Sequence, residues 1–178
     1  MANSQKHTPE PEPWQRDILA AFSEAQIRQI AFVPDAGLTG LIDLCEAENS
    51  LDTTVLTTEE EGIGLLAGAW LGGQRGALLM QSSGIGNCIN TLGLARVCQF
   101  PLLIVTTMRG EWHEFNPWQV PMAQATQPAL EAMGTIVHRA EEPGSVGALV
   151  ASGATMAFEG CLQIAVLIPQ RLIGRKNW

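Results

Sequence analysis

Short apolar runs, many of them rich in β-branched residues, alternate along the chain with longer stretches of mixed polarity. The apolar runs occupy residues 30–35, 53–58, 77–81, 101–107, 135–140 and 162–168. Each run is apolar on both faces, which is typical of a strand in a parallel sheet that helices cover on both sides. The stretches between the runs predict helices at 13–27, 37–48, 59–72, 86–98, 122–133 and 144–159.

Strand and helix alternate throughout, and successive parallel strands require right-handed crossovers. We therefore expect an α/β fold, a three-layer doubly wound domain with a mainly parallel six-stranded sheet. Ligands bind such sheets at the carboxyl ends of the strands. Four loops at that edge carry distinctive residues, namely 34–37, 58–61, 81–87 and 108–111.

The length and composition fit one globular domain. The chain has 178 residues, of which 46% are hydrophobic and 16% charged, so it can bury a sizeable core. We expect residues 1–12, which are polar and proline-rich, to be disordered and residues 13–178 to form the domain. Neither a signal peptide nor an apolar run of about 18 residues is evident, which favours a cytoplasmic protein. The net charge of -8 argues against nucleic-acid binding.

The cysteines and histidines do not form a metal-binding pattern. The four cysteines contain no CxxC pair, and the three histidines are isolated from them, so we expect reduced core thiols and no metal site in this chain. The residues concerned are Cys45, Cys88, Cys98, Cys161, His7, His113 and His138.

The acidic loop after residue 57 has two interpretations. Thr58 and Glu61 have the spacing of a capping box, which by itself accounts for both residues. Glu59, however, shares a helical face with Ile63 and Leu66, so its carboxyl group could lie on an apolar surface and exchange a proton near neutral pH. The helix that follows also carries side-chain-poor positions, which something must approach closely: Gly62, Gly64, Ala67, Gly68 and Ala69.

The other loops give weaker indications. The segment SSGIGN, residues 82–87, could present backbone N–H groups to a phosphate, or it could simply be a tight turn. Arg109 follows a strand and is either an anion-binding residue or a solvated one. Asp35 precedes Ala36 and Gly37 and is a candidate helix cap or turn former. No nucleophile elbow of the GxSxG type occurs.

Taken together, these loops resemble the pyrimidine-binding (PYR) domain of thiamine-diphosphate enzymes, in particular the sulfopyruvate and phosphonopyruvate decarboxylase family. The resemblance covers about residues 13 to 170 and is most specific in the block 58–92. It is carried by the segments TEEEGIGLLAGAWLGG (58–73), MQSSGIGNCINTL (80–92), TTMRGEW (106–112), QVPMAQATQPALEAMG (119–134) and VPDAG (33–37).

The resemblance implies a role for particular residues. Glu59 corresponds to the catalytic glutamate that hydrogen-bonds the aminopyrimidine ring of thiamine diphosphate and exchanges a proton with it. Further cofactor contacts are expected from Pro34, Asp35, Ser82, Ser83 and Gly84. Substrate contacts are expected from Gln81, Arg109, Trp112 and His113.

The resemblance also implies a partner chain. Enzymes of this kind need a second domain whose GDG motif holds Mg²⁺ and the diphosphate, and no GDG occurs in these 178 residues. The chain looks like the α subunit of an enzyme whose two domains lie on separate chains. We therefore expect a GDG-containing β subunit, an α2β2 heterotetramer and a shared active site.

Departures from the family pattern bear on the substrate. Ala36 and Ser82 replace a Ser and an Asn, and Ala123-Gln124 stands where a Gly-Arg pair is usual in the sulfopyruvate type. These changes favour a 2-oxo acid with a less charged or larger tail, lodged near Arg109, Trp112 and Trp118. Two alternatives stay open: a carboligase subunit that uses the same cofactor, and a non-catalytic flavodoxin-like binding module.

Overall fold

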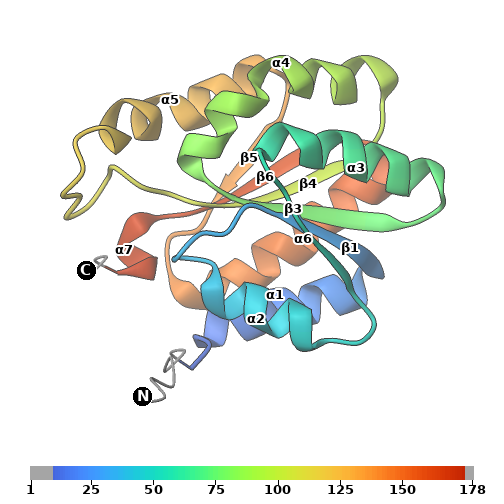
Figure 1. The fold of residues 1–178 in the computed structure, drawn as a ribbon, viewed down its shortest axis with the longest axis horizontal. Coiled ribbons are helices and arrows are strands. Elements are labelled where there is room, and N and C mark those ends of the chain that lie inside the picture. Colours follow the sequence, from blue (N-terminus) through green and yellow to red (C-terminus); the bar gives the residue numbers. More distant parts are fainter. Residues whose placement is uncertain (1–9, 175–178) are drawn as a thin grey trace, which may run out of the picture.

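A computed structural model describes residues 10–174 and contains one sheet of six parallel strands (Figure 1). The strand order is β2-β1-β3-β4-β6-β5, and every neighbouring pair is parallel. The strands are β1 (Ile27–Phe32), β2 (Asp52–Val55), β3 (Arg75–Gln81), β4 (Leu102–Thr107), β5 (Ile136–Arg139) and β6 (Gln163–Ile168). The doubly wound α/β architecture expected from the alternating pattern is thus confirmed.

Helices cover both faces of the sheet (Figure 1). On one face, α3 (Glu59–Leu71), α4 (Ser82–Cys98) and α5 (Gln119–Ala132) lie side by side, with α4 in the middle. On the other face, α1 (Pro13–Glu24) packs between α2 (Thr39–Ala47) and α6 (Val146–Gly160). A short 3₁₀ helix, η1 (Pro143–Ser145), precedes α6, and α7 (Gln170–Ile173) follows β6.

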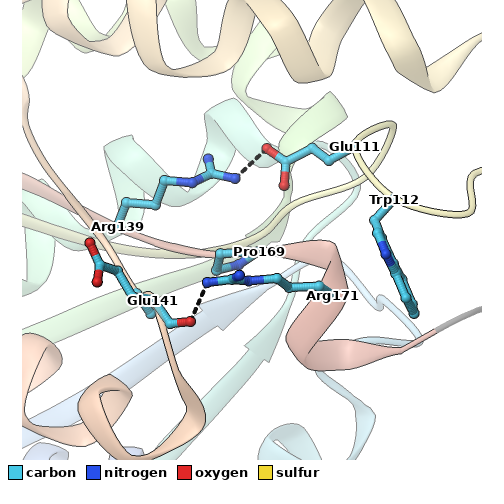
Figure 2. Close-up of a pocket in the computed structure, with 7 residues that line it drawn as sticks. Glu111, Trp112, Arg139, Glu141, Pro169 and Arg171 are labelled. Atoms are coloured by element: carbon cyan, nitrogen blue, oxygen red, sulfur yellow. Dashed lines mark hydrogen bonds and ion pairs between the residues drawn. The ribbon is translucent and has the colours of Figure 1, made fainter.

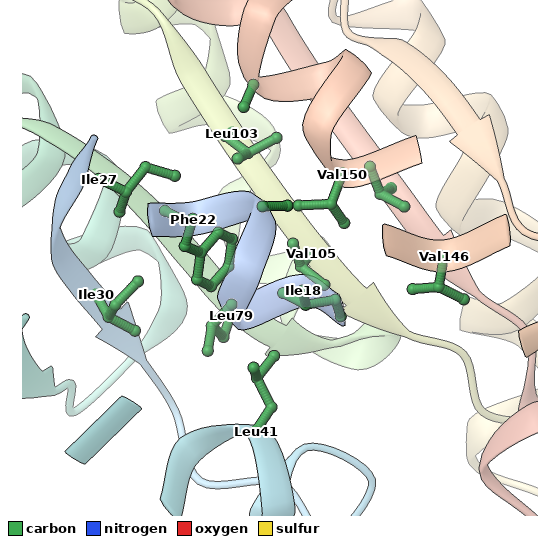
Figure 3. Close-up of a cluster of buried hydrophobic side chains, with 14 of the residues drawn as sticks. Ile18, Phe22, Ile27, Ile30, Leu41, Leu79, Leu103, Val105, Val146 and Val150 are labelled. Atoms are coloured by element: carbon green, nitrogen blue, oxygen red, sulfur yellow. The ribbon is translucent and has the colours of Figure 1, made fainter. Parts of the chain in front are cut away.

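The sheet separates two hydrophobic cores, because successive strand residues point to opposite faces. Leu79 and Leu103 belong to the core under α1, α2 and α6, where they meet Ile18 and Phe22 (Figure 3). Their chain neighbours, such as Leu78, belong to the core under α3, α4 and α5. The six residues of β4 are all buried, which explains why this run shows no alternation of polar and apolar positions.

Several sequence expectations differ from the structure. The strand expected at 30–35 is β1 (Ile27–Phe32), which lies three residues earlier in the chain. We expected a loop at residues 81–87 and a helix from residue 86, but α4 begins at Ser82, directly after β3. Cys45 and Cys88 are buried as expected, whereas Cys98 and Cys161 are exposed, so the expectation of four core thiols is wrong for two of them. The expectation of disorder at 1–12 falls mostly outside the described residues, as does His7. No helix among residues 10–174 has the length and apolar character needed to span a bilayer.

Candidate active site

Glu59 is the buried member of the acidic loop. It is the first residue of α3, and only 9% of it is exposed, whereas Glu60 and Glu61 are exposed. Ile63 and Leu66, on the same helical face, are buried as the spacing predicted. The position of Glu59 therefore follows from the apolar stripe of α3, which turns this face toward the sheet.

The first turns of α4 hold the Glu59 carboxyl group. Asn87 donates a side-chain N–H to Glu59 Oε2 at 2.7 Å. Gly84 lies against the other side of the carboxyl group, where a Cβ atom would come within 2.5 Å of both Cδ and Oε1. One carboxylate oxygen is thus fixed by an amide donor, and the close approach of α4 requires glycine at position 84.

Thr58 and Glu61 cap α3, as their spacing predicted. Glu61 accepts the backbone N–H groups of Thr57 at 2.9 Å and Thr58 at 3.4 Å. The second hydrogen bond of a capping box, from the Glu61 N–H to the Thr58 hydroxyl, is weaker. In the described part of the chain that hydroxyl has no hydrogen bond of ordinary geometry, and the Glu61 N–H donates to the Thr58 carbonyl oxygen instead. The cap is therefore maintained mainly by Glu61.

The residues at the junction of β3 and α4 divide into accessible and buried ones. Ser82 is fully buried, and its hydroxyl accepts the backbone N–H of Arg109 at 3.1 Å. The hydroxyl joins α4 to the end of β4, and a contact between Ser82 and the cofactor stays a prediction. Ser83 is half-buried and receives a hydrogen bond of 2.6 Å from Gln81, so this pair retains accessible surface.

The loop after β1 is organised by Asp35. Its carboxylate accepts the N–H of Gly37 at 3.0 Å and the hydroxyl of Thr107 at 2.7 Å, which makes it a turn former, as the sequence indicated. Pro34 is exposed beside it. Asp35 also lines a cavity of about 150 Å³ together with Arg109 and Gln170, so the ends of β1, β4 and β6 meet there.

Arg109 forms a buried ion pair. Its guanidinium group contacts Glu114 through two hydrogen bonds of 2.8 and 2.7 Å, and it donates to Gln81 Oε1 at 3.3 Å. The side chains of Arg109 and Glu114 are only 6% and 4% exposed. Two of the guanidinium donors are therefore already used by Glu114, and a part for Arg109 in substrate binding stays a prediction.

Glu114 has the most strongly perturbed carboxyl group of the site. The hydrogen bonds from Arg109 hold its pKa at about 2, against an ordinary value of 4.5. The backbone N–H groups of Asn116 and Gly110 and the amide of Gln170 act in the same direction. Glu114 is consequently ionised at every physiological pH and fixes the loop that follows β4.

Three aromatic residues of the 108–118 loop lie outside this buried cluster. Trp112 is 43% exposed and meets His113 edge to face, with ring centroids 4.3 Å apart. Trp118 is 84% exposed and lines an apolar cavity of about 700 Å³ with Ser83 and Met122. The structure thus brings Trp118 close to the start of α4, whereas Trp112 and His113 lie on the β5 and β6 side of the loop.

Sequence reasoning did not assign a role to Asn87, Glu114 or Gln170. Asn87 lies in the segment SSGIGN, but its partner is 28 residues away in the sequence. Glu114 and Gln170 meet across 56 residues, and no local pattern indicates that contact. Within residues 10–174 no group of three or more His, Cys, Asp or Glu side chains could hold a metal ion.

Comparison with known proteins matches residues 15–134 to the family described as thiamine pyrophosphate enzyme, N-terminal TPP binding domain. The sulfopyruvate decarboxylase subunit alpha of Methanococcus maripaludis is 32% identical over 152 residues, which are 85% of this chain and 91% of that protein. The same subunit of Methanocaldococcus jannaschii is 32% identical over 151 residues, 84% of this chain and 89% of that one.

Two further comparisons concern longer proteins. The phosphonopyruvate decarboxylase of Streptomyces viridochromogenes is 35% identical over 95 residues, which are 53% of this chain and 24% of that protein. A solved structure of a 2-oxoglutarate:ferredoxin oxidoreductase from Magnetococcus marinus matches with a TM-score of 0.73 and 16% identity, over 88% of this chain and 28% of that one. The latter similarity shows the fold alone.

Proposed function

Because the chain belongs to the thiamine pyrophosphate (thiamine diphosphate) enzyme family, we propose that it is the pyrimidine-side subunit of a two-subunit 2-oxo-acid decarboxylase. Its similarity to sulfopyruvate decarboxylase α subunits, which extends along most of its length, supports this proposal. The observation that carries this proposal is the Glu59 carboxyl group, buried at the end of β2 and held by Asn87. On this proposal the chain is a carbon–carbon lyase subunit that is inactive alone.

The residues around Glu59 fit an aminopyrimidine ring. Asn87 occupies Oε2, which leaves Oε1 to exchange a hydrogen bond with a ring nitrogen, and the buried side chains of Ile63 and Ile85 offer an apolar setting. Bound thiamine diphosphate would supply the carbon that accepts the electrons released when carbon dioxide leaves. The part of Glu59 is to hold a proton at that ring nitrogen and to exchange it with the ring.

The proposed partner is a GDG-containing β subunit that holds Mg²⁺ and the diphosphate, in an α2β2 assembly. The similarity to proteins called subunit alpha supports a partner. So does the outer surface of α3 and α4, the two helices that hold Glu59, because large apolar side chains are exposed there. These are Leu71 at 87%, Leu94 at 46% and Val97 at 82% exposure.

The proposed substrate is a 2-oxo acid whose tail differs from a sulfonate or phosphonate. Ala36 offers no hydroxyl to the cavity beside Arg109, and Glu114 already binds that guanidinium group with two hydrogen bonds. An anionic tail would have to compete with Glu114 for the cation, whereas a less charged tail would not. Trp118 and the apolar cavity near Ser83 suit a larger apolar group.

The test is co-purification with a GDG-containing chain, followed by a decarboxylation screen of 2-oxo acids with thiamine diphosphate and magnesium. Glu59→Gln is expected to lower kcat by at least about a hundredfold, since it removes the acid–base group. Glu60→Gln is the matched control: this neighbouring glutamate is exposed, and its loss is expected to leave kcat unchanged. Product identity distinguishes decarboxylation from carboligation.

An active Glu59→Gln enzyme would refute the assignment of Glu59 as the group that exchanges the proton. Failure of every GDG-containing candidate to form a complex would refute the two-subunit proposal. If sulfopyruvate proved clearly the best substrate in steady-state kinetics, the proposal of a different tail would be wrong.

A further inference from the structure

A further cavity lies at the carboxyl edge of the sheet, beside β5 and β6 (Figure 2). Glu59 follows β2, which is the opposite edge strand. The cavity has a volume of about 400 Å³, which is in the usual range for a small-molecule site. Its walls come from the loop after β4, from the end of β5 and from the start of α7. The side chains used below are Glu111, Trp112, Arg139, Glu141 and Arg171.

Two guanidinium groups face this cavity from different elements. Arg139, at the end of β5, pairs with Glu111 at 2.6 Å. Arg171, in α7, donates to the main-chain carbonyl oxygen of Glu141. Each of these interactions uses one terminal nitrogen, and within residues 10–174 neither group has another hydrogen bond. Most of their N–H donors therefore stay available to a ligand.

Among residues 10–174, no carboxylate is in direct contact with the guanidinium group of Arg171. Figure 2 shows the Glu141 carboxylate pointing away from Arg171, so that the contact between them is made by the backbone oxygen alone. The chain has 10 basic residues against 18 acidic ones. The cavity lining holds two arginines and two glutamates, so it is balanced in charge although the whole chain is acidic, and paired guanidinium groups suit a carboxylate, sulfonate or phosphate.

The cavity also has an aromatic wall. Trp112 lines it, and the edge-to-face contact with His113 fixes the plane of the indole ring. A flat apolar group that lies on this ring would be desolvated. The cavity is therefore suited to an organic anion rather than to an inorganic one.

Gln170 holds in place the loop that carries Glu111 and Trp112. Their backbone N–H groups donate to Gln170 Oε1 at 2.9 and 3.0 Å, and the amide nitrogen of Gln170 donates to Glu114 at 2.9 Å. Gln170 is 2% exposed. The cavity wall is thus continuous with the buried Arg109–Glu114 pair, which preorganises it for a ligand.

We propose that this cavity binds a small organic anion, whose charged group is held by Arg139 and Arg171 and whose flat apolar body lies on Trp112. The site is separate from Glu59, because β2 and β5 are the two opposite edge strands of the sheet. The inference rests on the cavity alone and stands whether or not the chain is a decarboxylase subunit.

Calorimetric titration of the full chain, without cofactor or partner, tests the proposal with phenyl phosphate and inorganic phosphate as probes. Saturable 1:1 binding is expected for phenyl phosphate, and weaker binding for inorganic phosphate. Arg139→Ala and Arg171→Ala should each weaken phenyl phosphate binding by about tenfold or more, the usual effect of losing a charge-assisted hydrogen bond. Trp112→Ala should bring the two probes to similar affinity.

Two variants serve as controls. Arg28→Ala removes an exposed arginine that, like Arg171, donates to a backbone carbonyl oxygen, but in β1, next to the opposite edge strand β2. It should leave binding unchanged, as should Glu59→Gln, and unfolding curves of all variants exclude loss of the fold. Absence of saturable binding, equal weakening by Arg28→Ala, or loss of binding in Glu59→Gln would each overturn the proposal. A persistent preference for phenyl phosphate in Trp112→Ala would overturn its aromatic part.

Discussion

Three consecutive glutamates in the first turn of α3 have three different surroundings. Glu61 caps the helix, Glu60 faces solvent, and Glu59 lies buried against α4. The difference comes from helical geometry, since each successive side chain is rotated by about 100° around the axis. Only the first of the three therefore shares the apolar face that meets the sheet.

Asn87 is expected to position Glu59 in the proposed reaction. Asn87→Ala removes the 2.7 Å hydrogen bond to Oε2 and frees the carboxyl group to rotate, so we expect kcat of the assembled enzyme to fall about tenfold while KM changes little. Asn90→Ala is the matched control, since Asn90 is exposed one turn further along α4.

A double-mutant cycle distinguishes this role from a structural one. If Asn87 acts through Glu59, then Asn87→Ala should have no further effect on the residual rate of Glu59→Gln. The free energies of unfolding of the unmodified chain, the two single variants and the double variant should also be non-additive, without any cofactor. Additive effects in both measurements would contradict the positioning role.

At the scale of elements, the site depends on how closely α3 and α4 approach each other. Gly84 provides that approach, since a Cβ atom there would lie within 2.5 Å of the Glu59 carboxyl group. Gly68 is the opposite case: a Cβ atom at this position of α3 would have no neighbour within 4 Å. Both are helix residues, so the same substitution tests packing in one case and helix propensity in the other.

Gly84→Ala is expected to destabilise the chain by about 1–3 kcal/mol, because it overpacks the contact with Glu59. Gly68→Ala is expected to stabilise the isolated chain by about 0.5–1 kcal/mol, the usual gain from replacing a helical glycine. Chemical denaturation measures both. Equal effects of the two substitutions would contradict the close packing of α4 on Glu59.

At the scale of the whole molecule, one buried cluster joins segments that are far apart in the sequence. Glu114 accepts hydrogen bonds from Arg109, from backbone groups of the same loop and from Gln170 in α7. The pKa of Glu114 is held at about 2 by these donors, chiefly by Arg109. The cluster therefore contributes to the stability of the fold through an ionised carboxylate.

The pH dependence follows from the direction of this pKa shift. Because the pKa of Glu114 is lower in the folded state, its contribution is complete above about pH 4.5 and is lost as the pH falls toward 2. We expect a loss of roughly 2 kcal/mol once solvent screening is allowed for. Glu114→Gln should be less stable than the unmodified chain at pH 7, and the difference should narrow between pH 4.5 and 2.

Acid titration of the free energy of unfolding checks this expectation, with Glu60→Gln as the control for an exposed carboxylate. If the difference in the free energy of unfolding between Glu114→Gln and the unmodified chain stayed constant down to pH 2, the buried ion pair would not be the source of the pH dependence.

The fold was predictable from sequence because its signal is local. Each apolar run corresponds to a strand, and the capping pair of Thr58 and Glu61 indicated the start of α3 at Glu59. The start of α4 was not predictable, since Ser82 and Gly84 are poor helix formers and the turn is stabilised by its packing on Glu59 and Arg109.

The sequence alone thus determined the strand–helix alternation, the parallel sheet and the side chains that gather at its carboxyl edge, because these depend on patterns within a few residues. Which side chains are available there was decided only by the tertiary structure. Arg109 looked like a free cation until the fold brought Glu114 and Gln170 to it, and Asn87 had no assigned role until α4 packed on α3. Hydrogen bonds between distant segments set the accessibility and charge of a group, and no local pattern encodes them.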